Sequence, residues 1–105
     1  MYNAVSDEIL LQVEKPARYV GREVNMVKKN PSDVDIRFAF CFPDVYEVGM
    51  SHLGLQILYY FLNRREDTYC ERVFAPWVDM EAKMREEKIP LFALESQESI
   101  RNFDF

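Results

Sequence analysis

One short stretch of the chain, between residues 44 and 54, holds most of the side chains that could bind a ligand. They are a carboxylate, a phenol, a hydroxyl, the single imidazole and two of the three glycines: Asp44, Tyr46, Ser51, His52, Gly49 and Gly54. The first half has the spacing Asp-x-Tyr-x-x-Gly. In metal sites a carboxylate often hydrogen-bonds the second ring nitrogen of a metal-bound histidine. Here the residue two positions after the aspartate is Tyr46 and not a histidine. We therefore treat the six residues as cofactor-binding candidates and assign none of them to a metal.

The spacing from Asp44 to Gly49 resembles the Asp-x-His-x-x-Gly loop that holds cobalamin in many cobalamin-binding domains. There the histidine nitrogen binds cobalt. A phenol stays protonated near neutral pH, so Tyr46 is a poor substitute. His52 has neither the required spacing to aspartate nor that to glycine. Two interpretations follow: a loop that cradles a corrin ring without ligating cobalt, or a strand-to-helix turn in which Asp44 caps backbone N–H groups and Tyr46 packs.

Other chemistry has weaker support. Adjacent side chains at a helix start point away from each other, so Ser51 and His52 do not form a nucleophile–base pair. The sequence has no glycine-rich phosphate loop and no zinc-ligand spacing. Cys41 and Cys70 are too few for a disulfide framework and fit buried thiols in a reducing cytoplasm. We expect Cys41 in the core, whereas Cys70 could be exposed.

The elements that position the candidates alternate between strand and helix. Residues Ile36–Phe42 alternate large apolar and smaller or polar side chains, which predicts a strand, and Pro43 ends it. A helix is expected over Ser51–Asn63, with Ser51 as its N-cap. This helix has two apolar stripes, so burial on two sides is expected. The candidates therefore fall at the carboxyl end of the first strand, where ligands gather in parallel sheets.

Further elements are predicted on both sides of this unit. A helix capped by Ser6 comes first and ends at Lys15, and the later part of the chain alternates again. The later elements are a strand over Cys70–Ala75, a helix over Pro76–Lys88 and a strand over Pro90–Glu95. This alternation predicts an α/β fold. We expect a truncated Rossmann-like or flavodoxin-like three-layer domain with a short, mostly parallel sheet of about three strands.

The chain divides into two regions by pattern. Residues 1–34 form an N-terminal helix and lead segment, and residues 35–105 form a partial Rossmann-like, cobalamin-binding-like domain. Phe103 to Phe105 resemble the approach to a further strand, so we expect the domain to be cut before its remaining strands. At least one edge of the sheet would then be open.

Composition limits the class of protein. The 105 residues are 49% hydrophobic, which indicates a folded domain, and they carry a net charge of −5. Residues 39–105 account for all of that charge, and an acidic surface opposes direct nucleic-acid binding. No apolar run is long enough to cross a membrane, and the first residues lack the pattern of a signal peptide. We expect a cytoplasmic protein that binds neither membrane nor nucleic acid directly.

Four blocks together resemble the N-terminus of a bacterial and archaeal family of radical S-adenosylmethionine proteins, iron–sulfur oxidoreductases with a cobalamin-binding-like N-terminal domain. The blocks are KPARYVGREVN (residues 15–25), FPDVYEVGMSHLGLQILYYFLN (42–63), ERVFAPWVDME (71–81) and PLFALES (90–96). The resemblance implies a Rossmann-like domain followed by a radical barrel. It also implies that Cys-x-x-x-Cys-x-x-Cys in the barrel holds a [4Fe–4S] cluster with one iron open for S-adenosylmethionine. This chain lacks that motif.

Three functions remain open. The first is a non-catalytic accessory domain, with the rest of the parent chain as its partner. The second adds contact with cobalamin. The third is a ligand-free interaction module that self-associates as a homo-oligomer through its doubly apolar helix or an open sheet edge. The substrate and reaction of the parent do not follow from these residues.

Overall fold

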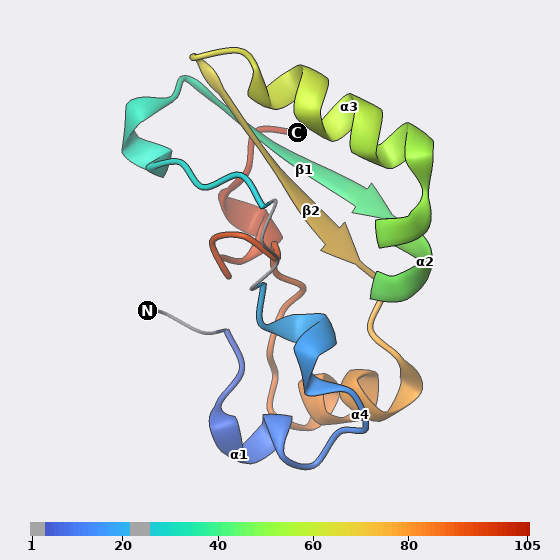
Figure 1. Ribbon diagram of the computed structural model, residues 1–105. Coiled ribbons are helices and arrows are strands. Elements are labelled where there is room, and N and C mark those ends of the chain that lie inside the picture. Colours follow the sequence, from blue (N-terminus) through green and yellow to red (C-terminus); the bar gives the residue numbers. More distant parts are fainter. Residues whose placement is uncertain (1–3, 22–25) are drawn as a thin grey trace.

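The computed structural model describes residues 4–21 and 26–105 and shows a mixed α/β chain (Figure 1). The elements follow in this order: α1 (Asp7–Leu10), 3-10 turns at Pro16–Tyr19 and Pro31–Asp33, β1 (Ile36–Phe42), α2 (Tyr46–Ser51), α3 (Leu53–Asn63), β2 (Thr68–Phe74), α4 (Val78–Glu86) and a 3-10 turn at Ile100–Asn102. The expected α/β class is confirmed. The predicted lead segment is described only in part, because residues 1–3 and 22–25 lie outside the described residues.

β1 and β2 form a parallel two-stranded sheet in which Phe38 lies opposite Cys70. The strand expected over Ile36–Phe42 is confirmed at both ends. β2 starts two residues earlier than its predicted start at Cys70 and ends at Phe74. The predicted parallel pairing is therefore present, with two strands in the described part of the chain instead of about three.

The predicted third strand over Pro90–Glu95 is wrong. Only one backbone hydrogen bond joins this segment to β2, from Leu94 N to Arg72 O at 2.8 Å. The Glu95 carboxylate takes the place of a ladder carbonyl, because its Oε1 accepts from Arg72 N at 2.9 Å. The segment then turns back on itself, with an isolated antiparallel bridge between Phe92 and Ser99.

The helix predicted over Ser51–Asn63 is confirmed as α3, which spans Leu53–Asn63, whereas Ser51 belongs to the short helix α2 before it. Ser51 ends α2, and its hydroxyl donates to Glu47 O at 2.8 Å. The N-cap of α3 is His52, whose Nδ1 accepts from Leu55 N at 3.1 Å. The N-cap of this helix is therefore the imidazole of His52 and not the predicted hydroxyl of Ser51.

The other helices are shorter than predicted. Ser6 caps α1 as expected, since its Oγ accepts from Ile9 N at 3.4 Å. The helix ends at Leu10 rather than near Lys15. α4 starts at Val78, two residues after Pro76, and ends at Glu86.

A hydrophobic cluster joins the start of the chain to α4. Its buried members are Val5, Ile9, Leu10, Val13, Tyr19, Met80 and Met84. Figure 1 shows α1 and α4 together at one end of the molecule, with α3 beside the two strands at the other. The cluster draws on both predicted regions of the chain, and the boundary at residues 34 and 35 stays a prediction.

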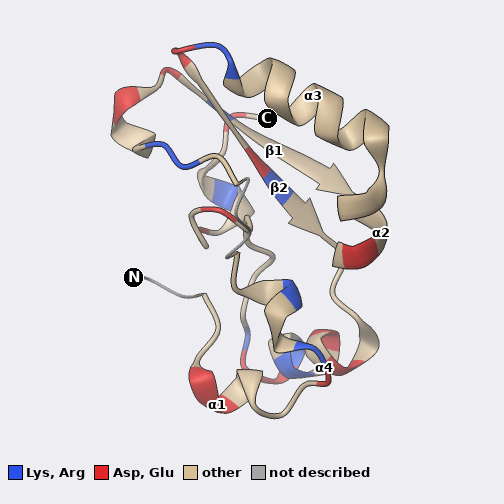
Figure 2. Cartoon of the chain, viewed as in Figure 1, with Lys and Arg blue, Asp and Glu red and all other residues tan. Residues whose placement is uncertain are grey.

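α3 buries one side only. Leu55 and Tyr59 are 2% and 1% exposed, whereas the second apolar stripe, made by Leu53, Ile57 and Phe61, is 68%, 58% and 64% exposed. The expected burial of both sides is therefore wrong in this structure. No lysine, arginine, aspartate or glutamate lies on α3, so this exposed face is uncharged (Figure 2).

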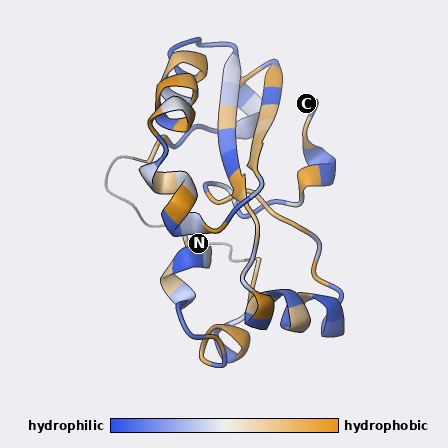
Figure 3. Ribbon diagram, turned by 90° about the vertical axis from the view of Figure 1, so that its right-hand side faces the viewer, coloured by the Kyte–Doolittle hydropathy of each residue, from blue (hydrophilic) through white to orange (hydrophobic). Residues whose placement is uncertain are grey.

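The middle of the sheet is more polar than the sequence pattern suggested. Of the two parallel strands, one is largely hydrophobic, and the other is interrupted by a hydrophilic stretch (Figure 3). That stretch contains Glu71 and Arg72 of β2, which are 0% and 5% exposed. Two charged side chains are thus buried next to each other in sequence, pointing to opposite faces of the sheet.

The two cysteines occupy the reverse of their expected positions. Cys41, expected in the core, is exposed near the end of β1, and Cys70 is fully buried in β2. Both cysteines lie in strands, but only the side chain of Cys70 in β2 is covered by other residues. Burial raises the pKa of the Cys70 thiol to about 12.

Candidate functional site

The turn after β1 ties together the carboxyl ends of both strands. Asp44 N donates to Phe42 O at 2.8 Å, and Asp44 O accepts from Ala75 N at 2.8 Å. The exposed Asp44 carboxylate accepts from Val45 N at 2.7 Å through Oδ1. The backbone of Asp44 therefore has a structural role, while its carboxylate faces solvent.

Tyr46 and Gly49 face inward from α2 and pack on one ring. The Tyr46 ring meets the Phe74 ring edge-on, with centroids 5.8 Å apart. A Cβ on Gly49 would stand 2.1 Å from Cε1 of the same ring. Gly49 is therefore needed for the close approach of α2 to β2, a role independent of any ligand.

The other three candidates lie around the junction of α2 and α3. Ser51 is exposed and back-bonded to its own helix. The His52 ring caps α3 and lies 5.1 Å from the Phe42 ring. A Cβ on Gly54 would come within 3.0 Å of His52 Cε1, so Gly54 leaves room for the capping ring. The six candidates lie on one short segment in which a helix, α2, fills the expected loop, and their binding of a ligand stays a prediction.

This arrangement does not supply a cobalt ligand. Tyr46 packs on Phe74, and the His52 nitrogen Nδ1 is occupied by the Leu55 N–H. The Asp44 carboxylate accepts from the N–H of the neighbouring Val45. We therefore derive no chemistry at a cobalt ion from these residues.

Two small cavities flank α2, and Arg72 lines both. One of about 30 Å³ lies between Arg18, Tyr46 and Phe74. The other, of about 100 Å³, lies between α2 and α3 and is lined by Met50. The first has room for only a water molecule or two. Neither encloses a corrin ring, so any such ligand has to lie on the outside of the turn.

Arg72, which lines both cavities, belongs to a buried ion pair. Arg72 is paired with Glu95, which is 1% exposed, through a contact of 2.7 Å between Nε and Oε2. The Arg72 guanidinium also lies 4.3 Å from the centroid of the Tyr59 ring. Burial raises the pKa of Glu95, although Arg72 opposes the rise. Burial also raises the pKa of the Tyr59 hydroxyl, which accepts from Val27 N at 3.0 Å.

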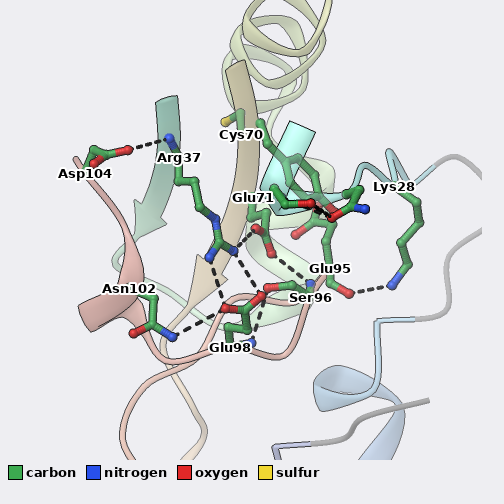
Figure 4. A network of polar contacts seen from close by, with 12 residues as sticks. Lys28, Arg37, Cys70, Glu71, Glu95, Ser96, Glu98, Asn102 and Asp104 are labelled. Atoms are coloured by element: carbon green, nitrogen blue, oxygen red, sulfur yellow. Dashed lines mark hydrogen bonds and ion pairs between the residues drawn. The ribbon is translucent and has the colours of Figure 1, made fainter. Parts of the chain in front are cut away.

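A second charged group lies on the other face of the sheet (Figure 4). Arg37 Nη2 contacts Glu71 Oε2 at 2.9 Å, and Arg37 Nη1 contacts Glu98 Oε1 at 3.0 Å. The other Glu71 oxygen accepts from Ser96 N at 2.8 Å. Burial lowers the pKa of Arg37, but hydrogen bonds to Glu98 and Glu71 outweigh it, so the pKa is raised overall.

These charged residues were missed in the sequence. The available signal was Glu71-Arg72 inside a predicted buried strand, together with Arg37 in the other strand and Glu95 after an apolar run. Charged residues are almost never fully buried unless they are paired. Their positions therefore indicated pairing, but the partners come from segments far apart in the sequence.

The chain's thiols do not fit a [4Fe–4S] cluster. Such a cluster needs three thiolates from the protein when one iron stays open, and the sequence has only Cys41 and Cys70. Within residues 4–21 and 26–105, no group of three His, Cys, Asp or Glu side chains could hold a metal ion. No step of iron–sulfur chemistry follows from this chain.

Comparison with known proteins gives one match. Residues 54–105, just under half of the chain, match the family described as "Radical SAM proteins, N-terminal". This match supports a radical SAM family protein, and it starts at Gly54, directly after the turn that holds the other candidates. No curated protein and no solved structure matches the chain.

The match begins within α3 and includes β2, α4 and the segment to Phe105. It therefore covers Arg72 and Glu95 and leaves β1 and α2 outside.

Among the helices of the described residues, none combines the length and the apolar character needed to span a membrane.

Proposed function

We propose that the chain is the non-catalytic N-terminal accessory domain of a cytoplasmic radical S-adenosylmethionine iron–sulfur oxidoreductase. The observation that carries the proposal is the family match over residues 54–105. The cluster and S-adenosylmethionine belong to the radical barrel of the parent, because two isolated cysteines are too few to hold the cluster. The domain covers or feeds that barrel.

The test is iron loading of the full-length parent. The parent is reconstituted without oxygen using iron and sulfide, as wild type and as the variants Cys41→Ser and Cys70→Ala. We expect cluster absorption and the same iron content per chain in all three. A wild type without cluster absorption would falsify the radical-enzyme assignment. Loss of iron in Cys41→Ser, a change at an exposed position, would show that this domain supplies a ligand.

A finer proposal is that the segment from Asp44 to Gly54 touches cobalamin without binding cobalt. It is supported by the Asp-x-Tyr-x-x-Gly outline and by the position at the carboxyl end of β1. Titration of the parent with hydroxocobalamin tests it, with Asp44→Ala as the variant and Asp33→Ala, another exposed aspartate, as the control. We expect heat of binding that weakens only in Asp44→Ala. The absence of heat and of spectral change at high micromolar concentration would count against contact.

A second candidate function is a ligand-free interaction module that self-associates. The uncharged, exposed stripe of α3 favours it. Light scattering on the 105-residue chain at rising concentration provides the test. We expect Phe61→Glu to lower the apparent mass and Leu11→Glu, at an exposed apolar position outside α3, to leave it unchanged. A strictly monomeric wild type would remove this candidate.

A further inference from the structure

Phe105 occupies the position of the first residue of a strand parallel to β1. Phe105 N donates to Arg37 O at 3.3 Å, and Ala39 N donates to a main-chain oxygen of Phe105 at 2.8 Å. A residue that bonds in this way to residues 37 and 39 is in parallel register with Phe38. The Phe38 and Phe105 rings agree with this register, since their centroids are 6.1 Å apart. The pairing is on the edge of β1 opposite β2.

The remainder of this edge is open. In a strand the N–H and C=O of one residue point to the same side, and the sides alternate along the chain. The Ala39 carbonyl and the Cys41 N–H therefore face the same edge as the groups that bond Phe105. Within the described part of the chain, neither group makes a backbone hydrogen bond on this edge. Such an edge is a template for a further strand.

An apolar groove runs between this edge and α3. It has a volume of about 510 Å³, and its apolar walls include Phe38, Phe40, Leu58 and Phe61. A neighbouring groove, lined by Ile36 and Phe105, continues it toward the start of β1. In the register set by Phe105, the second and fourth residues of a continuing strand would lie beside Phe40 and Phe42, on the side of this groove.

We propose that a parallel strand, formed by the residues that follow Phe105 in the parent protein, occupies the open edge of β1. Because the groove is apolar, we expect apolar side chains at the second and fourth residues after Phe105. The inference rests on the proposed function, because it takes the strand from the parent. β1 becomes an inner strand, with β2 on one side and the later strand on the other.

This arrangement places a second loop beside the Asp44–Gly54 turn, at the carboxyl end of the sheet. The chain leaves β1 toward β2 on one edge and returns later to the other edge, so the strand order reverses at β1. In open α/β sheets, ligands bind outside the carboxyl ends of the strands at such a point. The turn after β1 then forms one wall of a crevice, and the loop that follows the added strand forms the other.

The test is amide hydrogen exchange at Cys41, measured in the 105-residue chain and in the full-length parent. The Ala39 amide, already bonded to Phe105, is the internal reference. A hydrogen bond in a covered sheet protects an amide against exchange. We expect the Cys41 amide to exchange at least about tenfold more slowly in the parent, while the Ala39 amide changes much less.

Two results would overturn the proposal. The first is equal exchange of Cys41 in the chain and in the parent. The second is protection in the 105-residue chain that increases with protein concentration, because a second copy would then cover the edge. The iron content of the same parent sample is measured separately. A parent without a cluster would disprove the radical-enzyme assignment, and the exchange of the Cys41 amide would still test the added strand.

Discussion

Gly49 lies so close to Phe74 that a Cβ on the glycine would stand 2.1 Å from the ring. We therefore expect Gly49→Ala to lower the free energy of unfolding by about 1–3 kcal/mol, because the overpacked ring has to move. The matched control is Gly54→Ala, whose Cβ meets the side chain of His52 at 3.0 Å. The measurement is urea unfolding of both variants and of wild type.

A rescue variant makes this prediction specific. Phe74→Leu removes the ring that the new methyl group meets, so Gly49→Ala should cost less in that background than in wild type. Equal costs in both backgrounds would show that the Gly49–Phe74 contact is not what limits substitution at Gly49.

The Arg72–Glu95 pair should be strongly coupled to folding. Removing one partner of a buried ion pair costs about 3–5 kcal/mol, because the other charge stays buried without compensation. We expect this loss for Glu95→Gln in chemical unfolding. Asp67→Asn, which breaks the exposed pair with Arg65, is the control and should change stability little. A small effect of Glu95→Gln would mean that Arg72 is satisfied without the carboxylate.

The contact between Arg18 and Glu47 predicts a pH effect. The hydrogen bond from Arg18, at 2.8 Å, lowers the pKa of Glu47 below its usual value. For a carboxyl group with a depressed folded pKa, the contribution to stability is present above the unfolded pKa and lost as pH falls through the folded one. NMR titration should therefore give a low pKa for Glu47 that returns toward the ordinary value in Arg18→Met. An unchanged pKa in that variant would contradict the contact.

Thiol labelling should distinguish the two cysteines. Burial raises the pKa of both thiols, but Cys41 is exposed, whereas Cys70 is fully buried and its pKa rises to about 12. Because the thiolate is the reactive form, we expect one equivalent of a thiol reagent to react near pH 8 in the native chain and two after unfolding. Cys41→Ser should abolish the native reaction. Rapid native labelling of Cys70 would place it outside the core.

Local patterns in the sequence predicted the elements well where side chains alternate clearly. Ile36–Phe42 alternates over seven residues and ends at Pro43, and the strand forms with those bounds. The pattern failed where a side chain replaced a backbone partner. His52 caps α3 with an imidazole nitrogen, and Glu95 places a carboxylate oxygen where a third strand would have placed a carbonyl. Neither substitution follows from periodicity.

The place of the candidate segment in the fold followed from the sequence, whereas its binding of a ligand stays a prediction. Asp44 to Gly54 does follow β1 at the carboxyl end of the sheet, yet α2 fills the expected loop and Gly49 serves packing against Phe74. Arg72 and Glu95 were missed because they are 23 positions apart in sequence, and only the folded chain brings them together. Pairing between distant residues leaves no signal in local spacing.

The contact between Arg37 and Asp104 has a consequence for the order of events on the ribosome. Arg37 N donates to Asp104 Oδ2 at 2.8 Å across 67 positions, and Arg37 O accepts from the same segment. β1 and β2 are complete once residue 74 has emerged, but Arg37 and Ala39 on the outer edge of β1 gain their partners only when residues 104 and 105 have been made. A contact this distant in sequence forms late. During synthesis the nascent chain therefore exposes an apolar strand edge after the two strands are complete, and such an edge is prone to pairing with other chains.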